Sequence, residues 1–136
     1  MGARTIIQSY YDAFNAGDVA AFIGLVTDDV VHDINQGARE IGKDAFQAFV
    51  NRMNRCYREQ LTDIVIFESP DGTRGAAEFT VNGQYLATDE GLPEATGQTY
   101  TIPAGAFFEL RDGKVARITN YYNLTDWIAA VAKPSD

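Results

Sequence analysis

Cysteine and histidine are nearly absent from this sequence, with one of each among 136 residues. The lone Cys56 cannot form an internal disulfide, so we expect a reducing, cytoplasmic location. One histidine and one cysteine, far apart in the chain, cannot supply the usual nitrogen and sulfur ligands of a protein metal site. The sequence therefore predicts no metal site.

Basic residues and long apolar runs are also scarce. The chain has 11 lysines and arginines against 19 acidic residues, a net charge of −8, which argues against a nucleic-acid partner. No run reaches the roughly 18 apolar residues of a membrane span, and the first residues form no apolar signal segment, so no membrane contact is expected. Glycine-rich phosphate loops and a serine in a nucleophile-elbow motif are missing as well. No cofactor is therefore expected.

The chain does contain enough apolar material for one hydrophobic core. Apolar residues make up 46% of the sequence and aromatic residues 12%, which argues against disorder. A length of 136 residues corresponds to about one domain, and no repeat, linker or low-complexity segment divides it. Residues 1–136 are therefore predicted to form a single domain.

The period of the apolar residues changes from helical to strand-like along the chain. Residues 4–16 and 43–57 show helical spacing, and a short helix follows Asp18, which suits a helix N-cap. From Leu61 onward, strands are predicted over residues 61–68, 74–88, 99–111 and 115–122, before a closing helix that begins at Leu124. Helices followed by a meander predict an α+β domain with helices packed on one face of a curved antiparallel sheet, around a cone-shaped hollow.

The opening strand, within residues 30–37, carries an acid where a strand should bury its side chains. Alternation places Asp33 and Asn35 on one face and His32 on the other, where a structural role is expected for the histidine. If Asp33 faces the core, its charge must be paired or its pKa must rise, and a raised pKa would make it a base for proton transfer. The alternative is an acid paired with Arg39 or with a backbone amide.

On the last strand, successive side chains alternate between the two faces, which places the charged Arg117 on one face and Asn120 and Tyr122 on the other. The charged side chain marks the outer face, so Asn120 and Tyr122 are predicted to point into the hollow. Asn120 could there donate to an oxyanion or fix a substrate carbonyl, or it could be a strand residue satisfied by its neighbours.

Several short segments together resemble one superfamily. They are residues 10–18 (YYDAFNAGD), 28–33 (DDVVHD), 42–46 (GKDAF), 91–98 (GLPEATGQ) and 112–115 (DGKV). In this order they resemble the nuclear transport factor 2-like superfamily, in particular its ketosteroid isomerase-related and SnoaL-like polyketide cyclase branches. The resemblance implies a cone-shaped, cystatin-like roll, and the superfamily includes isomerases, cyclases, epoxide hydrolases and non-catalytic binders.

The resemblance also implies roles for individual residues. Asp33 falls where the steroid isomerases keep their general base, and Tyr10 falls where they keep a phenol that donates to the oxyanion. Gly105 and Asn123 stand where relatives carry acids, so two acids of the pattern are missing. The remaining predicted substrate-binding residues are Asn35, Asn120, Tyr122, Phe79, Tyr85 and Phe107, whose aromatic members are alternatively plain core.

Together these features predict a cofactor-independent isomerase or lyase-type enzyme. Asp33 would act as the general base on a small apolar carbonyl substrate, as in a steroid delta-isomerase or a polyketide cyclase. A non-catalytic small-ligand-binding module and an epoxide hydrolase-like enzyme are the alternatives. A homodimer that pairs through the outer face of the sheet is also expected.

Overall fold

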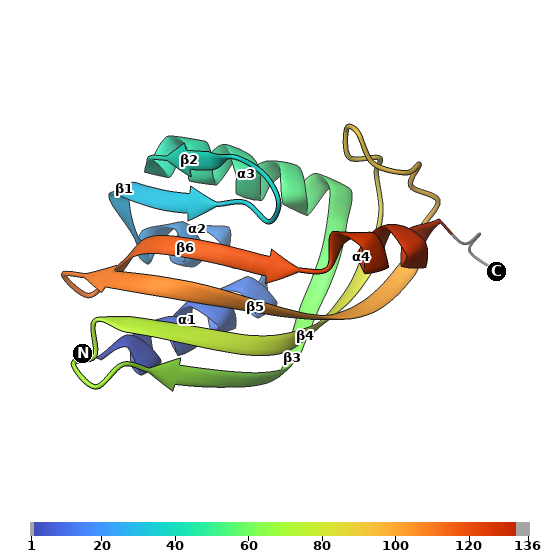
Figure 1. The fold of residues 1–136 in the computed structure, drawn as a ribbon. Helices are drawn as coiled ribbons and strands as arrows, with labels where there is room; N and C mark the ends of the chain where they lie inside the picture. Colours follow the sequence, from blue (N-terminus) through green and yellow to red (C-terminus); the bar gives the residue numbers. More distant parts are fainter. Residues whose placement is uncertain (1, 133–136) are drawn as a thin grey trace.

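Helices cover one face of a single sheet in this computed structural model, which describes residues 2–132. In chain order the elements are α1 (Ala3–Ala16), α2 (Val19–Gly24), β1 (Val26–Asp33), β2 (Arg39–Ile41), α3 (Lys43–Cys56), β3 (Tyr57–Glu68), β4 (Arg74–Tyr85), β5 (Thr99–Arg111), β6 (Lys114–Tyr122) and α4 (Leu124–Val131). The strand order is β2-β1-β6-β5-β4-β3. In Figure 1, α1, α2 and α3 lie behind the sheet. The predicted α+β class is confirmed.

One pair of strands departs from the purely antiparallel sheet that the sequence predicts. Strand β1 runs parallel to β6, whereas every other neighbouring pair is antiparallel. Strand β6 can approach β1 in this direction because α3 and four strands separate the two along the chain, and a parallel pair needs such a long connection. The sheet is therefore mixed, with β2 and β3 at its open edges.

The helix boundaries follow local capping signals. Gly17 ends α1 in the left-handed region, with φ of 69°, and the Asp18 side chain accepts a hydrogen bond from the Ala21 backbone N at 3.1 Å. At the other end of the chain, the Asn123 side chain accepts from the backbone N of Asp126 at 3.0 Å and begins α4. The predicted helix starts at positions 18 and 124 are confirmed.

The boundary between α3 and β3 differs from the prediction. The helix ends at Cys56, and the strand begins at once at Tyr57 rather than at Leu61. Residues 57–60 pair with residues 82–85 of β4, and this ladder holds the segment extended. As a consequence Glu59 lies on a strand, on the same face as Tyr57 and Leu61.

The first strand also has different limits. Strand β1 begins at Val26, four residues before the predicted strand, and ends at Asp33. The expected loop over residues 37–42 contains the short strand β2, which pairs with β1. Because β1 has ended, Asn35 lies in a turn, so the alternation that grouped it with Asp33 does not apply.

The core lies between α1, α2 and α3 and the concave face of the sheet. Helix α1 packs on β3 and β4, and Gly75 permits this close approach, since a Cβ there would lie 2.4 Å from Cδ1 of Ile7. Phe108 and Ile118 are fully buried on the same face. Within residues 2–132, no helix is both long and apolar enough to cross a membrane.

Candidate functional site

The register between β1 and β6 decides which side chains of β1 face the helices. His32 pairs with Ile118, and Asp33 pairs with Thr119. Ile118 is buried in the core, and the His32 ring packs edge-on against Phe46 and Phe49 of α3. His32 therefore faces the concave side, whereas Asp33 faces away from the helices.

Asp33 is held by a guanidinium on the outer face of the sheet. Arg39 donates from Nε to Oδ1 at 2.6 Å and from Nη2 to Oδ2 at 3.0 Å, and the Thr119 hydroxyl donates to Oδ2 at 2.6 Å. These bonds, above all those from Arg39, lower the pKa of Asp33 from 3.8 to about 2. The predicted pocket environment of Asp33 and the predicted rise in its pKa are both wrong. The ion pair with Arg39 that the sequence left open is present.

Two adjacent phenols of α1 enter the core. Tyr10 packs against Tyr11, Phe22 and Phe108, and burial raises its pKa far above the ordinary value of 10.0. The Tyr11 ring lies against Phe79 of β4, and its hydroxyl is buried without a hydrogen-bond partner among the described residues. The donor role of Tyr10 stays a prediction, and Tyr11 is a second candidate that the sequence did not single out.

A carboxyl group with the expected property lies on another strand of the concave face. Glu59 is half-buried, and burial raises its pKa above the ordinary value of 4.5. The Tyr100 hydroxyl donates to Oε2 of Glu59, which opposes part of this rise. Gly83 lies between the two strands and makes room for the ring, since a Cβ there would lie 2.2 Å from Cζ of Tyr100.

Tyr122 extends this group of side chains from the end of β6. Burial raises the pKa of its phenol, and the carboxylates of Glu59 and Asp89 raise it further. The Asn35 Oδ1 accepts from the Tyr122 backbone N at 3.2 Å, and the Asn35 amide opposes the rise of the phenol pKa. The structure therefore brings Asn35 to Tyr122 rather than to Asp33.

Aromatic side chains and a buried acid form the wall beside Glu59. The rings of Tyr57 and Tyr85 stack at 5.3 Å, and Trp127 of α4 meets both edge-on. Tyr57 donates to Oδ2 of Asp89 at 2.8 Å, and Tyr85 donates to the Pro93 carbonyl at 2.6 Å. The ring of Tyr85 thus packs within this wall, and its hydroxyl binds the loop that follows β4.

Two other predicted lining residues, Phe79 and Phe107, lie on opposite faces of the sheet. Phe79 is half-buried on the concave face, where it meets Tyr11. Phe107 lies on the outer face, is 51% exposed and packs edge-on against Tyr121. Its predicted place in the pocket is wrong, because adjacent residues of β5 point to opposite faces and Phe108 takes the inner position.

Asn120 lies on the concave face, as the parity of β6 predicts. Its Nδ2 lies 3.5 Å from Nε2 of His32, and the other ring nitrogen of His32 lies 4.0 Å from Oε1 of Glu40. Burial lowers the pKa of His32 from 6.5 to about 4, so the ring is neutral at physiological pH. His32 is therefore not only a packing residue, since each of its ring nitrogens lies within 4.0 Å of a polar side-chain atom.

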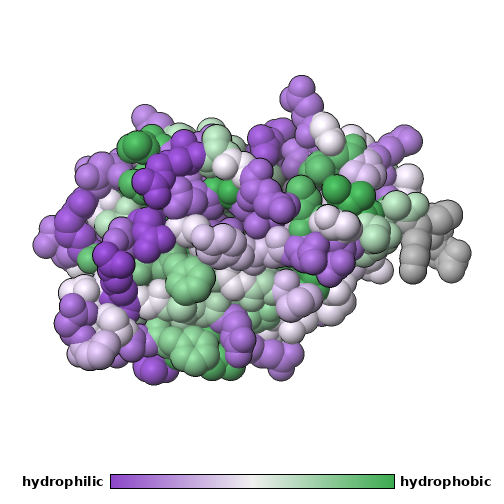
Figure 2. Space-filling view, in the orientation of Figure 1, coloured by the Kyte–Doolittle hydropathy of each residue, from purple (hydrophilic) through white to green (hydrophobic). Residues whose placement is uncertain are grey.

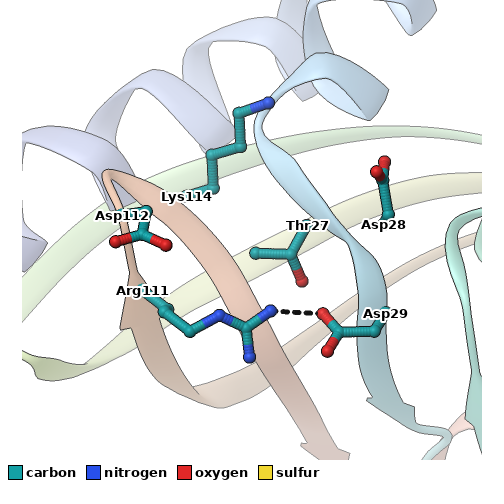
Figure 3. Close-up of a pocket in the computed structure, with 6 residues that line it drawn as sticks. All are labelled: Thr27, Asp28, Asp29, Arg111, Asp112 and Lys114. Carbon is teal, nitrogen blue, oxygen red and sulfur yellow. Dashed lines mark hydrogen bonds and ion pairs between the residues drawn. The ribbon is translucent and has the colours of Figure 1, made fainter.

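A surface hollow of about 410 Å³ lies elsewhere, beside the β5–β6 hairpin. Figure 3 shows the side chains that line it, Thr27, Asp28, Asp29, Arg111, Asp112 and Lys114. Arg111 donates to Asp29, and Lys43 lies 3.5 Å from Asp28, so these charges neutralise one another. Within residues 2–132, no group of three His, Cys, Asp or Glu side chains could hold a metal ion. The predicted site residues lie outside this hollow.

Comparison with known proteins identifies the family. The family described as the SnoaL-like domain matches residues 7–118. The chain belongs to the SnoaL-like domain family. No curated protein matches this chain.

Solved structures of other proteins superpose on this chain. A candidate polyketide cyclase from Pseudomonas putida KT2440 is 62% identical, with 96% of this chain and 98% of that chain covered and a TM-score of 0.95. A second, from Xanthomonas campestris pv. campestris, is 56% identical, with coverages of 95% and 96% and a TM-score of 0.91. A protein from Catenulispora acidiphila with a ketosteroid isomerase-like fold is 18% identical, with coverages of 95% and 93% and a TM-score of 0.75, which shows the fold alone.

Glu59 is a candidate site residue that the sequence did not reveal. The available signal was its spacing: Glu59 is two residues from both Tyr57 and Leu61, so in a strand it shares their apolar face. The predicted helix ended at Tyr57 and the predicted strand began at Leu61, so no parity was assigned between them. The start of β3 at Tyr57 corrects this.

Proposed function

We propose that this SnoaL-like protein is a cofactor-independent acid–base enzyme, of the isomerase or cyclase type, that acts on a small apolar carbonyl compound. The observation that carries the proposal is Glu59, a half-buried carboxyl on the concave face whose pKa burial raises. A carboxylate that is partly stripped of water is a stronger base and remains reachable. Close relatives named as candidate polyketide cyclases support the reaction type.

The proposed reaction moves one proton. The ionised Glu59 takes a proton from the carbon beside the carbonyl, and the electron pair shifts onto the carbonyl oxygen. The Tyr122 phenol, whose ordinary pKa of 10.0 is raised further by burial, is neutral at physiological pH and can donate a hydrogen bond to that oxygen. In an isomerisation, the enolate then recovers the proton from Glu59 at another carbon. In an aldol cyclisation, it attacks a second carbonyl, and the alkoxide that forms takes the proton from Glu59, which restores the carboxylate.

The neighbouring side chains support this assignment. Tyr100 donates to Glu59 and fixes the position of the carboxylate, while Tyr57 and Trp127 provide an apolar wall on that side. Asp33 lacks these properties, because Arg39 stabilises its ionised form on the outer face. We therefore assign the base to Glu59 rather than to Asp33.

The variant Glu59→Gln tests the assignment, with the exposed Glu90→Gln as its matched control. The substrates are a β,γ-unsaturated steroid ketone for isomerisation and a polyketide methyl ester for cyclisation. Loss of a general base lowers kcat by about 10²–10⁴-fold, so Glu59→Gln should fall in this range and Glu90→Gln should match the wild type. The wild-type rate should rise with pH through a pKa above 4.5, the ordinary value for this carboxyl.

Full activity of Glu59→Gln on every substrate that the wild type converts would refute the base assignment. Binding of these compounds without turnover by the wild type would instead favour a ligand-binding module. Thermal unfolding of both variants, measured in parallel, separates loss of the base from loss of the fold.

We also propose that two copies of the chain pair through the outer face of the sheet. Phe67, Phe107 and Tyr121 are each more than half exposed on β3, β5 and β6. Figure 2 shows apolar side chains, in green, among polar ones on this face. Exposed apolar groups of this kind are typical of interfaces. The face also carries both signs of charge, for example Arg117 against Glu109 at 3.0 Å, which suits a two-fold contact between identical surfaces.

A further inference from the structure

His32 is buried, with only 2% of its surface exposed, yet its polar atoms are not satisfied in the usual way. Its Nδ1 has no hydrogen-bond partner among the described residues, and neither has Oε1 of Glu40, although the two atoms are only 4.0 Å apart. On the other side of the ring, Nε2 lies 3.5 Å from Nδ2 of Asn120. Buried polar atoms normally find partners, so this set calls for an explanation.

Glu40 determines which nitrogen of the ring carries the proton. An ionised carboxylate only accepts hydrogen bonds, so a lone pair on Nδ1 would face it unfavourably, whereas an N–H at Nδ1 is attracted. The neutral ring has one N–H, and with that proton on Nδ1 the opposite nitrogen, Nε2, becomes an acceptor. The tautomer of His32 is therefore set by Glu40.

An acceptor at Nε2 in turn fixes the side-chain amide of Asn120. The amide must direct Nδ2 toward His32, because its oxygen would meet the Nε2 lone pair. The oxygen Oδ1 lies on the other branch of the planar amide, away from the imidazole. No described residue donates a hydrogen bond to this oxygen, and it is not among the fully buried atoms that lack partners, so it is not fully buried.

Asn120 also lies close to the group that the proposed function uses. It shares the concave face of β6 with Tyr122, and alternate residues of a strand are about 7 Å apart. Opposite Asn120, strand β5 carries the small side chain of Ala106. A compound whose carbonyl reaches Tyr122 can therefore place a second group beside Asn120.

We propose that His32 and Glu40 are positioning residues, which hold the Asn120 amide so that its Oδ1 accepts a hydrogen bond from a hydroxyl or enol group of the substrate. This inference rests on the proposed function and narrows its substrate class. The substrate carries an enolisable carbonyl and, at a separate position, a hydrogen-bond donor. The arrangement differs from the oxyanion-donor role that the sequence analysis considered for Asn120.

Nitrogen NMR tests the positioning pair directly, because His32 is the only histidine in the sequence. In ¹⁵N-histidine-labelled protein at neutral pH, we expect the tautomer with its proton on Nδ1. Glu40→Ala should shift the ring toward the Nε2–H tautomer, and Glu90→Ala should leave the spectrum unchanged. An Nε2–H tautomer in the wild type, or an unchanged tautomer in Glu40→Ala, overturns the proposal.

Binding of two naphthalene probes tests the acceptor role of Asn120. 2-Naphthol carries a hydroxyl donor, and 2-methoxynaphthalene of similar shape does not. By fluorescence titration the wild type should bind 2-naphthol about fivefold more tightly, the effect of one neutral hydrogen bond. Asn120→Ala should remove this preference and Glu40→Ala should reduce it, with thermal unfolding as the check on folding.

Equal affinity of the wild type for the two probes, or binding of neither, overturns the acceptor role. Neither experiment depends on turnover or on Glu59. A result against the positioning role of His32 and Glu40 can therefore be distinguished from a result against the proposed function, since the Glu59→Gln assay tests only the proposed function.

Discussion

Replacing Asp33 with Asn tests whether this acid stabilises the fold or takes part in the reaction. The substitution removes the negative charge that Nε and Nη2 of Arg39 contact, at 2.6 and 3.0 Å, while it keeps a side chain of the same shape. The acid lies on the outer face of the sheet. We therefore expect a loss of stability with activity retained.

The size of the effect follows from the pKa. A fall from 3.8 to about 2 corresponds to at most about 2.5 kcal/mol of stabilisation of the ionised form. The Arg39 side chain is 58% exposed, and solvent screening of such a pair reduces the value to about 1 kcal/mol. Because the folded-state pKa is lowered, this stabilisation is complete above the ordinary pKa of 3.8 and is lost as the pH falls through about 2.

A double-mutant cycle with urea unfolding measures the stabilisation that the Asp33–Arg39 ion pair provides. Asp33→Asn, Arg39→Gln and the double variant should give a coupling energy of about 1 kcal/mol at pH 7, which disappears near pH 2. Absence of coupling at pH 7, or equal coupling at both pH values, would refute the stabilising role. Loss of turnover in Asp33→Asn with the fold intact would show that this acid is catalytic after all.

Two further predictions concern the Glu59 site and the outer face. Gly83→Ala places a methyl group 2.2 Å from the Tyr100 ring, so the phenol should leave Glu59 and turnover should fall by about 10²-fold. Tyr100→Phe removes only the hydroxyl, and so separates loss of the hydrogen bond to Glu59 from displacement of the ring. Normal turnover of Gly83→Ala would contradict the prediction. Phe107→Glu should convert a dimer to a monomer by light scattering, whereas Ile128→Glu on α4 should not, and a monomeric wild type would exclude the dimer.

Local patterns in the sequence were sufficient for the helices and for the order of the long strands. Gly17 followed by Asp18 stops one helix and starts the next through their own backbone and side-chain hydrogen bonds, which depend on only a few neighbouring residues. Strand parity was equally local. It correctly separated Arg117 from Asn120, because successive side chains of any strand point to opposite faces.

Parity alone could not say which face of β1 points inward. That choice depends on the register of β1 against β6, a pairing of residues more than 80 positions apart that places Asp33 beside Thr119. The apolar neighbours of Asp33 along the sequence suggested burial. The register instead placed Asp33 on the outer face, next to Arg39 from β2.

The sequence by itself thus determined the fold class, the helices and the alternation of each strand, because these features depend on contacts within a few residues. Only the tertiary structure decided that Glu59 lies on the concave face beside Tyr100. Its environment is made by Tyr100, Gly83 and Tyr122, which belong to three other strands. A carboxyl pKa responds to the burial and charges around it in space, and these are set by how the strands pair and how the helices pack over them.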